Sequence, residues 1–252
     1  MRKIKKVVLP EGVTFIGERT FANCNNLKII SLPKTLKSVG TEVFAFCEGI
    51  ESIDLHVEKL SLGRGAFLGC INLKEIIFPN SIDYISRECF KGCISLEKIV
   101  LPEVWAVEEE AFEYNSNLKS VVFSGTVAKI GKSCFAKNEK IEEVVFLNLN
   151  PPPEVHFEIE DTAFFGNANL REIIFPNNLV SIGTCAFAQC ISLEKVILPE
   201  RLKKIGESAF YNCNSLKEIE ISGNVKILPR SIFGSCTSLK KIVLIWMTIL
   251  NK

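Results

Sequence analysis

The segment IGTCAFAQCISLEKVILP, residues 182–199, decides the fold, because its pattern returns along the whole chain. The phenylalanine near its start, Phe187, marks each copy. Successive copies are 22 or 23 residues apart, except for one spacing of 29. An internal period of this length is typical of solenoid proteins. The marking residues are Phe21, Phe44, Phe67, Phe90, Phe112, Phe135, Phe164, Phe187, Phe210 and Phe233.

Other apolar columns keep the same spacing. An aliphatic residue stands five positions before each Phe, a Leu or Ile six after it, and apolar residues nine and eleven after it. The alternation at the last two positions predicts a short strand with one buried face. Proline, which lacks an amide hydrogen, often ends that strand, as at Pro199. The A-F-x-x-C stretch predicts one helical or 3₁₀ turn on the opposite side.

One such unit cannot bury its own apolar face, whereas stacked units can. We therefore predict an α/β chain leaning to β: a right-handed leucine-rich-repeat solenoid of about ten repeats. Each repeat is expected to supply one parallel strand and a short helical or 3₁₀ turn. Residues 1–252 form one solenoid, interrupted by a proline-rich insertion at 147–158 and ending in a segment at 245–252.

The pattern resembles the BspA-type leucine-rich repeats (type 5, with 23-residue repeats), whose consensus runs roughly I-G-x-x-A-F-x-x-C-x-x-L-x-x-I-x-L-P. Residues 182–193 match it nearly throughout, and so do residues 205–213. The resemblance covers essentially the whole chain. It implies a surface or interaction protein, often adhesive, with no catalytic activity. The consensus often has Thr ten positions after the Phe, where this chain carries Val or Ile.

Seven of the ten cysteines stand three positions after the marking Phe, and Asn115, Asn138 and Asn167 fill that column in the other repeats. Zinc, disulfide and redox sites are the functional interpretations. A buried structural column is favoured, because Cys is small and its thiol donates weakly to a carbonyl, while an Asn amide satisfies buried backbone groups. We expect free thiols, no metal and no cofactor.

Residues that carry chemistry are few. The two histidines, His56 and His156, have no partnered nucleophile in a known motif, and no phosphate-binding or dinucleotide-binding glycine motif occurs. The acidic run at residues 108–110 is interpreted as a solvated turn, with contact to a basic partner as the alternative. The formal net charge of +1 argues against nucleic-acid binding. We expect a protein that is not an enzyme.

The outward strand positions carry the candidate binding site. Ten residues after the Phe, six consecutive repeats carry only Val or Ile, and eight residues after it stands a row of mixed charge. An exposed apolar stripe bordered by charge is typical of a protein-binding surface, although β-branched residues also simply suit a sheet. The candidate partner-binding residues are Glu75, Ile77, Lys98, Val100, Val122, Glu143, Val145, Glu172, Ile174, Lys195 and Ile197.

Two irregular segments are further candidates. The insertion contains Pro151, Pro152 and Pro153 and should project as an extended bulge near one end of the sheet. It is a binding loop, a neutral insertion, or the mark of a small bend between a block of six repeats and a block of four. The apolar end of the chain is either a cap, or a self-association segment through Ile245, Trp246 and Ile249, or a truncated array. Self-association would make the protein a homo-oligomer.

The expected cellular location follows from what precedes the first repeat. A basic start is followed by too few apolar residues for a secretion signal, and no run of about 18 apolar residues that could span a membrane occurs. Free thiols would fit a reducing compartment. We therefore expect a cytoplasmic scaffold that binds another protein. The alternative is a cell-surface adhesin or structural surface protein of which this sequence is a trimmed piece.

Overall fold

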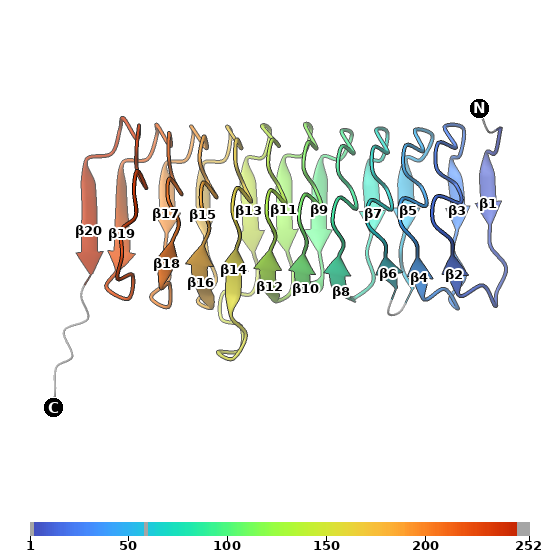
Figure 1. The fold of residues 1–252 in the computed structure, drawn as a ribbon, viewed down its shortest axis with the longest axis horizontal. Helices are drawn as coiled ribbons and strands as arrows, with labels where there is room; N and C mark the ends of the chain where they lie inside the picture. Colours follow the sequence, from blue (N-terminus) through green and yellow to red (C-terminus); the bar gives the residue numbers. More distant parts are fainter. Residues whose placement is uncertain (1–2, 58–59, 246–252) are drawn as a thin grey trace.

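The computed structural model describes residues 3–57 and 60–245, and it shows a solenoid whose repeats stack along one axis (Figure 1). The predicted leucine-rich-repeat solenoid of parallel strands is thereby confirmed: every strand pair in it is parallel. Partners in neighbouring repeats are mostly 22 or 23 residues apart, as Val121 and Val144 are. The period of the sequence is therefore the pitch of one coil.

The strands of the I-x-L segment form what we call the major sheet. Its hydrogen bonding is continuous from β9 to β17 and is interrupted toward both ends. Its strands are β1 (Lys6–Val8), β3 (Ile29–Ser31), β5 (Ser52–Asp54), β7 (Glu75–Ile77), β9 (Lys98–Leu101), β11 (Ser120–Phe123), β13 (Glu143–Phe146), β15 (Glu172–Ile174), β17 (Lys195–Ile197), β19 (Glu218–Ser222) and β20 (Lys241–Ile245).

Most repeats contribute a second strand, which the sequence did not predict. It forms at the aliphatic anchor before the Phe, and these strands build what we call the minor sheet, continuous from β8 to β18. Its strands are β2 (Phe15–Ile16), β4 (Ser38–Val39), β6 (Ser61–Leu62), β8 (Ser81–Ile85), β10 (Glu103–Val107), β12 (Val127–Ile130), β14 (Phe157–Ile159), β16 (Leu179–Ile182) and β18 (Lys204–Ile205).

The expected helical or 3₁₀ turn is wrong: in the described residues the A-F-x-x-C stretch forms hydrogen-bonded turns and no helix. Cys185 and Gln189 have φ angles of 52° and 64°, in the left-handed region, so a right-handed helix cannot continue through them. Alternate amides instead donate to the next repeat, as Phe187 N does to Ala209 O at 2.8 Å. All three sides of the coil are thus hydrogen-bonded to their neighbours.

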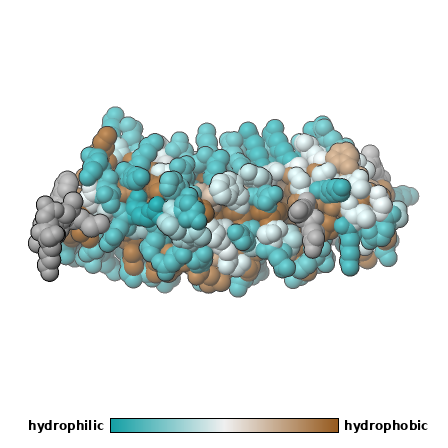
Figure 2. Space-filling view, turned by 90° about the horizontal axis from the view of Figure 1, so that it is seen from below, coloured by the Kyte–Doolittle hydropathy of each residue, from teal (hydrophilic) through white to brown (hydrophobic). Residues whose placement is uncertain are grey.

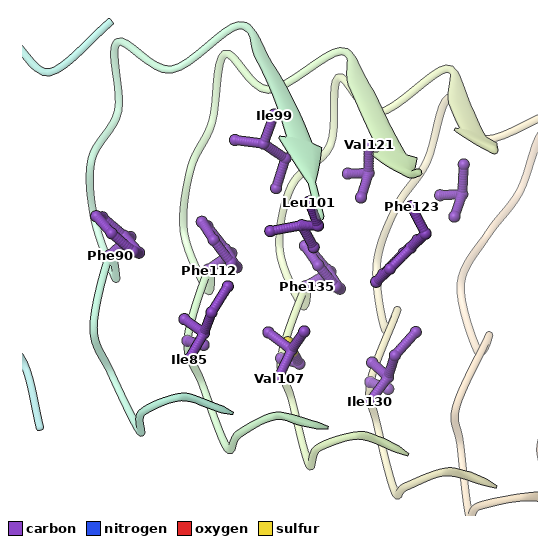
Figure 3. Packing of buried hydrophobic residues seen from close by; sticks show 14 of the residues in the cluster. Ile85, Phe90, Ile99, Leu101, Val107, Phe112, Val121, Phe123, Ile130 and Phe135 are labelled. Atoms are coloured by element: carbon purple, nitrogen blue, oxygen red, sulfur yellow. The ribbon is translucent and has the colours of Figure 1, made fainter. Parts of the chain in front are cut away.

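The marking phenylalanines form a continuous stack inside the solenoid. Neighbouring rings lie 5.1 to 5.9 Å apart and nearly parallel. Figure 3 shows Phe90, Phe112 and Phe135 in this column, facing the aliphatic anchors of the minor sheet. Phe123 of the major sheet meets the Phe135 ring edge-on, at 6.2 Å and 83°. Phe recurs at this position of every repeat because each ring packs on the ring of the next repeat.

The cysteine column is structural, as the sequence indicated. The Cys190 thiol donates to the carbonyl of Phe164 in the preceding repeat at 3.3 Å, and the same bond recurs down the column. Asn138 makes the equivalent bond, from Nδ2 to Phe112 O at 2.9 Å. All ten cysteines are free.

The three asparagines of this column stand in consecutive repeats and form a ladder of hydrogen bonds. Asn115 N donates to Asn138 Oδ1 at 2.6 Å, and Asn138 N donates to Asn167 Oδ1 at 3.1 Å. The Oδ1 atoms of Asn138 and Asn167 therefore each accept a hydrogen bond from the main-chain amide of the preceding repeat. Where the ladder starts, Asn115 Oδ1 has no hydrogen-bond partner among the described residues.

Thiol accessibility gives a direct test of this column. Only Cys185 and Cys236 are partly exposed; the other cysteines are buried. Burial raises the pKa of both Cys47 and Cys190 to about 12, so these thiols stay protonated and unreactive near pH 8. We expect a thiol reagent to label two cysteines in the folded protein and ten after denaturation. Rapid labelling of a third cysteine without denaturant would contradict the buried column.

Candidate protein-binding surface

The predicted apolar stripe lies on the outward face of the major sheet, and we call it the ridge: Ile77, Val100, Val122, Val145, Ile174 and Ile197. Strand pairing places its members side by side. Val122 is paired with Val100 on one side and with Val145 on the other, and Ile174 is paired with Ile197. The side chains of Val100 and Ile197 are 46% and 43% exposed, while Val122 and Val145 are half-buried. The structure therefore brings the six apolar candidates into one row.

The charged candidates form a second row beside the ridge, and all five are exposed: Glu75, Lys98, Glu143, Glu172 and Lys195. Lys195 Nζ contacts Glu172 Oε1 at 2.7 Å. The buried hydroxyl of Ser120 lies 2.6 Å from Glu143 Oε1 and donates a hydrogen bond to it. These contacts hold two of the carboxylates in place along the ridge.

A further charged row, which the sequence reasoning missed, lies one residue before the second row. Its members alternate in sign over most of its length, and neighbours in adjacent repeats form ion pairs, such as Lys119 with Glu97 at 2.9 Å. The Lys119 ammonium holds the pKa of Glu97 below its ordinary value. Because residues two repeats apart mostly carry the same charge, pairing them would place like charges together. The alternation therefore favours the observed pairing between adjacent repeats. The row reads Lys28, Glu51, Lys74, Glu97, Lys119, Glu142, Arg171, Glu194, Lys217 and Lys240.

Charged residues end the ridge in both directions. Asp54 is paired with Ile77, and Glu220 is the equivalent residue of β19, beyond Ile197. A hollow of about 330 Å³ lies at this second end, lined by Ile197, Glu218, Glu220 and Ile245 among others. The ridge is thus a bounded surface of six repeats.

The acidic run at residues 108–110 is paired with basic residues of the chain itself. Glu108 lies 3.5 Å from Lys129, and Glu109 and Glu110 pair with Arg87 and Lys91 at 3.2 and 2.6 Å. The run is therefore neutralised within the chain. Ile245 is 47% exposed on β20. Trp246 and Ile249 lie outside the described residues, so self-association stays a prediction.

The outward face of the minor sheet carries aromatic residues that the sequence reasoning also missed. Trp105 on β10 is 57% exposed and Tyr84 on β8 is 50% exposed. Trp105 belongs to the segment EVWAV, in which Val104 is buried and both flanking residues point outward. That alternation, read as a second strand, would have placed this tryptophan on the surface.

The proline-rich insertion joins the end of β13 to β14 and projects from one side of the solenoid (Figure 1). Contacts with later repeats hold it: Asn177 N donates to Leu149 O at 2.8 Å, and Arg201 donates to Pro153 O at 2.9 Å. On the side of the earlier repeats, Val155 reaches a hollow of the minor sheet. Figure 2 views the molecule from this side and shows hydrophobic side chains among hydrophilic ones. The insertion therefore extends the minor-sheet face.

The repeat framework matches a known protein family. The family described as BspA type leucine rich repeat region matches the chain in six copies, over residues 1–105, 58–151 and 157–249. The chain belongs to the BspA-type leucine-rich repeat family. The matched ranges omit residues 152–156, which are the tip of the insertion. The BspA-type repeat thus accounts for the framework, and the insertion is an addition to it.

The chain is similar to solved structures with other sequences. Pneumococcal vaccine antigen PcpA is 21% identical with a TM-score of 0.52, over 97% of this chain and 69% of that one. A leucine rich cell surface protein from Faecalibacterium prausnitzii A2-165 is 19% identical, with a TM-score of 0.42, over 96% and 88%. A leucine-rich repeat protein from Bacteroides ovatus ATCC 8483 is 21% identical, with a TM-score of 0.39, over 98% and 85%. No curated protein matches the chain.

The remaining chemistry of this BspA-type chain is sparse. Within residues 3–57 and 60–245, no group of three or more His, Cys, Asp or Glu side chains is placed to hold a metal ion. In the same ranges no helix is long and apolar enough to cross a membrane.

Proposed function

We propose that this protein is a non-catalytic scaffold that binds another protein through the outward face of its major sheet, with the ridge as the contact. One observation supports the proposal most: six exposed or half-buried Val and Ile side chains lie in one row bordered by charged rows, and the five on β9 to β17 belong to one continuous sheet. Unpartnered apolar surface with a polar rim is typical of a binding site. Six strands at about 4.8 Å spacing give a ridge roughly 24 Å long, enough for a helix or strand of a partner.

The ridge departs from what sheet stability alone requires. Threonine, which the family often carries at this position, is also β-branched and suits a strand equally well. Val and Ile in six consecutive repeats add apolar surface without adding strand preference. The charged Asp54 and Glu220 then limit that surface to the middle of the solenoid.

The family supports a location at the cell surface for this scaffold over the cytoplasmic one expected from the sequence. The cysteine argument for a reducing compartment has little weight, because eight of the ten thiols are buried. Buried, hydrogen-bonded thiols resist oxidation in either compartment. We therefore propose the surface scaffold as the more specific form of this function.

Two charges introduced on the ridge test the proposal. We expect Val122→Glu combined with Val145→Glu to abolish capture of the partner in an affinity pull-down from the native cell. Each new carboxylate would be buried against apolar partner atoms without a counter-charge. The matched control, Ser38→Glu with Ser181→Glu, places two carboxylates on the minor sheet and should capture the partner as the unchanged protein does.

A milder variant covers the possibility that two facing carboxylates destabilise the sheet. Val122→Thr with Val145→Thr keeps the shape and the strand preference, and it should weaken binding about tenfold by removing two methyl contacts. Circular dichroism and thermal unfolding report whether each variant folds. Undiminished capture by both folded ridge variants would overturn the proposal.

A further inference from the structure

The minor sheet has a four-residue arrangement on its outward face that the ridge does not use. In β8, Ser81 and Asp83 point outward on either side of the buried Ile82; in β10, Glu103 and Trp105 do the same around Val104. Ser81 is paired with Glu103, and the ladder places Asp83 beside Trp105. Two carboxylates therefore lie next to an indole ring that is 57% exposed.

Small residues of the next repeat leave a hollow beside this ring. The pairing of Val104 with Val127 brings Ala128 next to Trp105 and Thr126 next to Glu103. Because alanine has only a methyl group, a space of about 320 Å³ remains, with Val155 of the insertion lining it as well. The insertion thus supplies part of the lining of a site on the minor sheet.

A second, smaller hollow continues from the first. It has a volume of about 120 Å³ and is lined by Leu60, Ser61 and Tyr84 together with Ser81, Ile82 and Asp83, which the two hollows share. The ionisable groups that line the pair, apart from the Tyr84 phenol, are Asp83 and Glu103, both acidic. No ion pair to either carboxylate occurs within the described part of the chain, whereas nearby Lys129 is paired with Glu108 and Glu160.

We propose that this surface binds a basic segment of a partner protein, with an arginine side chain against Trp105 and its guanidinium next to Asp83 and Glu103. The occupant follows from charge complementarity. A planar cation stacks on an indole face, and a guanidinium is the cation that also bonds carboxylates in a plane. The unpaired carboxylates and the exposed aromatic ring suit the guanidinium group of arginine, and the apolar walls suit its aliphatic part. The site is separate from the ridge and extends the proposed function to a second surface.

A short peptide pair tests the chemistry directly. The probe is acetyl-Ser-Arg-Gly-Arg-Ser-amide, which offers one arginine to each hollow; its twin replaces both arginines by citrulline, which has the same shape and no charge. Fluorescence is read in the full chain carrying Trp246→Phe, so that Trp105 is the only tryptophan. We expect the arginine peptide to bind at least tenfold more tightly than its twin, and to weaken as salt is raised.

Variants separate the site from general attraction between charges. Asp83→Asn with Glu103→Gln should bring the affinity for the arginine peptide down to that of the citrulline peptide. Glu75→Gln with Glu218→Gln, which removes two exposed carboxylates from the major sheet, should leave it unchanged, as should Val122→Thr with Val145→Thr. Equal binding of the two peptides would overturn the proposal, and so would equal losses in the two carboxylate variants. Either result would leave the proposed binding through the ridge unaffected.

Discussion

Replacing Phe135 by alanine is expected to lower the free energy of unfolding by about 3–5 kcal/mol, the usual cost of truncating a fully buried Phe. Its side chain is 0% exposed. The ring stacks on Phe112 at 5.4 Å and on Phe164 at 5.3 Å, and it meets Phe123 edge-on. The change therefore removes three ring contacts and leaves a cavity in the middle of the stack.

The measurement is urea denaturation followed by circular dichroism. Phe21→Ala is the matched control: Phe21 is half-buried and has one ring neighbour, Phe44 at 5.5 Å. We expect the control to lose less than half as much stability. In a solenoid each repeat is stabilised by its two neighbours, so the Phe135 variant should also unfold over a wider range of urea. Equal losses at both positions would show that the phenylalanine stack does not hold the repeats together.

Replacing Asn138 by leucine is expected to cost about 2–4 kcal/mol although leucine is the more apolar residue. Asn138 Nδ2 donates to the carbonyls of Phe112 and Phe135 at 2.9 and 3.1 Å, and its Oδ1 accepts from the Asn115 amide. Leucine leaves the Phe135 carbonyl and the Asn115 amide buried without partners, at about 1–3 kcal/mol each, with partial relaxation reducing the sum. The Phe112 carbonyl keeps the hydrogen bond that Asn115 Nδ2 donates to it at 2.9 Å.

Asn138→Cys distinguishes the lost hydrogen bonds from the changed shape. Cysteine occupies this column in seven repeats and should restore the bond to Phe112 O, as Cys190 bonds Phe164 O at 3.3 Å. We expect a loss of about 1–2 kcal/mol, smaller than for leucine, because the bond to Phe112 O is kept in a weaker form while the bonds to Phe135 O and from the Asn115 amide are lost. Thermal unfolding of both variants compares them. A leucine variant as stable as the cysteine one would show that the asparagine ladder adds nothing beyond filling space.

The solenoid and the ridge could be predicted because both follow from the period. Once Phe187 and its equivalents fix the spacing, alternation decides which residues of Lys195–Ile197 point outward, and the structure agrees. The turn conformation could not be derived in the same way. Nothing in Cys185 or Gln189 indicates a positive φ. Glycines with positive φ stand at the equivalent positions of other repeats and carried that signal: Gly65 at the first position, and Gly69, Gly92 and Gly166 at the second.

The minor-sheet site depends on contacts that no period encodes. Trp105 was hidden in a segment interpreted as a single aliphatic anchor, and the second strand that exposes it appears only when neighbouring repeats pair. The approach of Val155 depends on the path of the insertion, which Arg201 and Asn177 fix from later repeats. Such placement needs the folded chain.

The hydrogen bonding on all three sides of the coil has an evolutionary consequence. Because each repeat is joined to the next through the same backbone bonds, a duplicated repeat finds a matching junction wherever it is inserted. Asp54 and Glu220 end the apolar row while belonging to the same framework as its members. Gene duplication therefore lengthens the array by about 4.8 Å per repeat, and single substitutions at these two ends lengthen the apolar row. The length of the solenoid and the extent of its apolar row can therefore change in separate steps, and neither step requires a new fold.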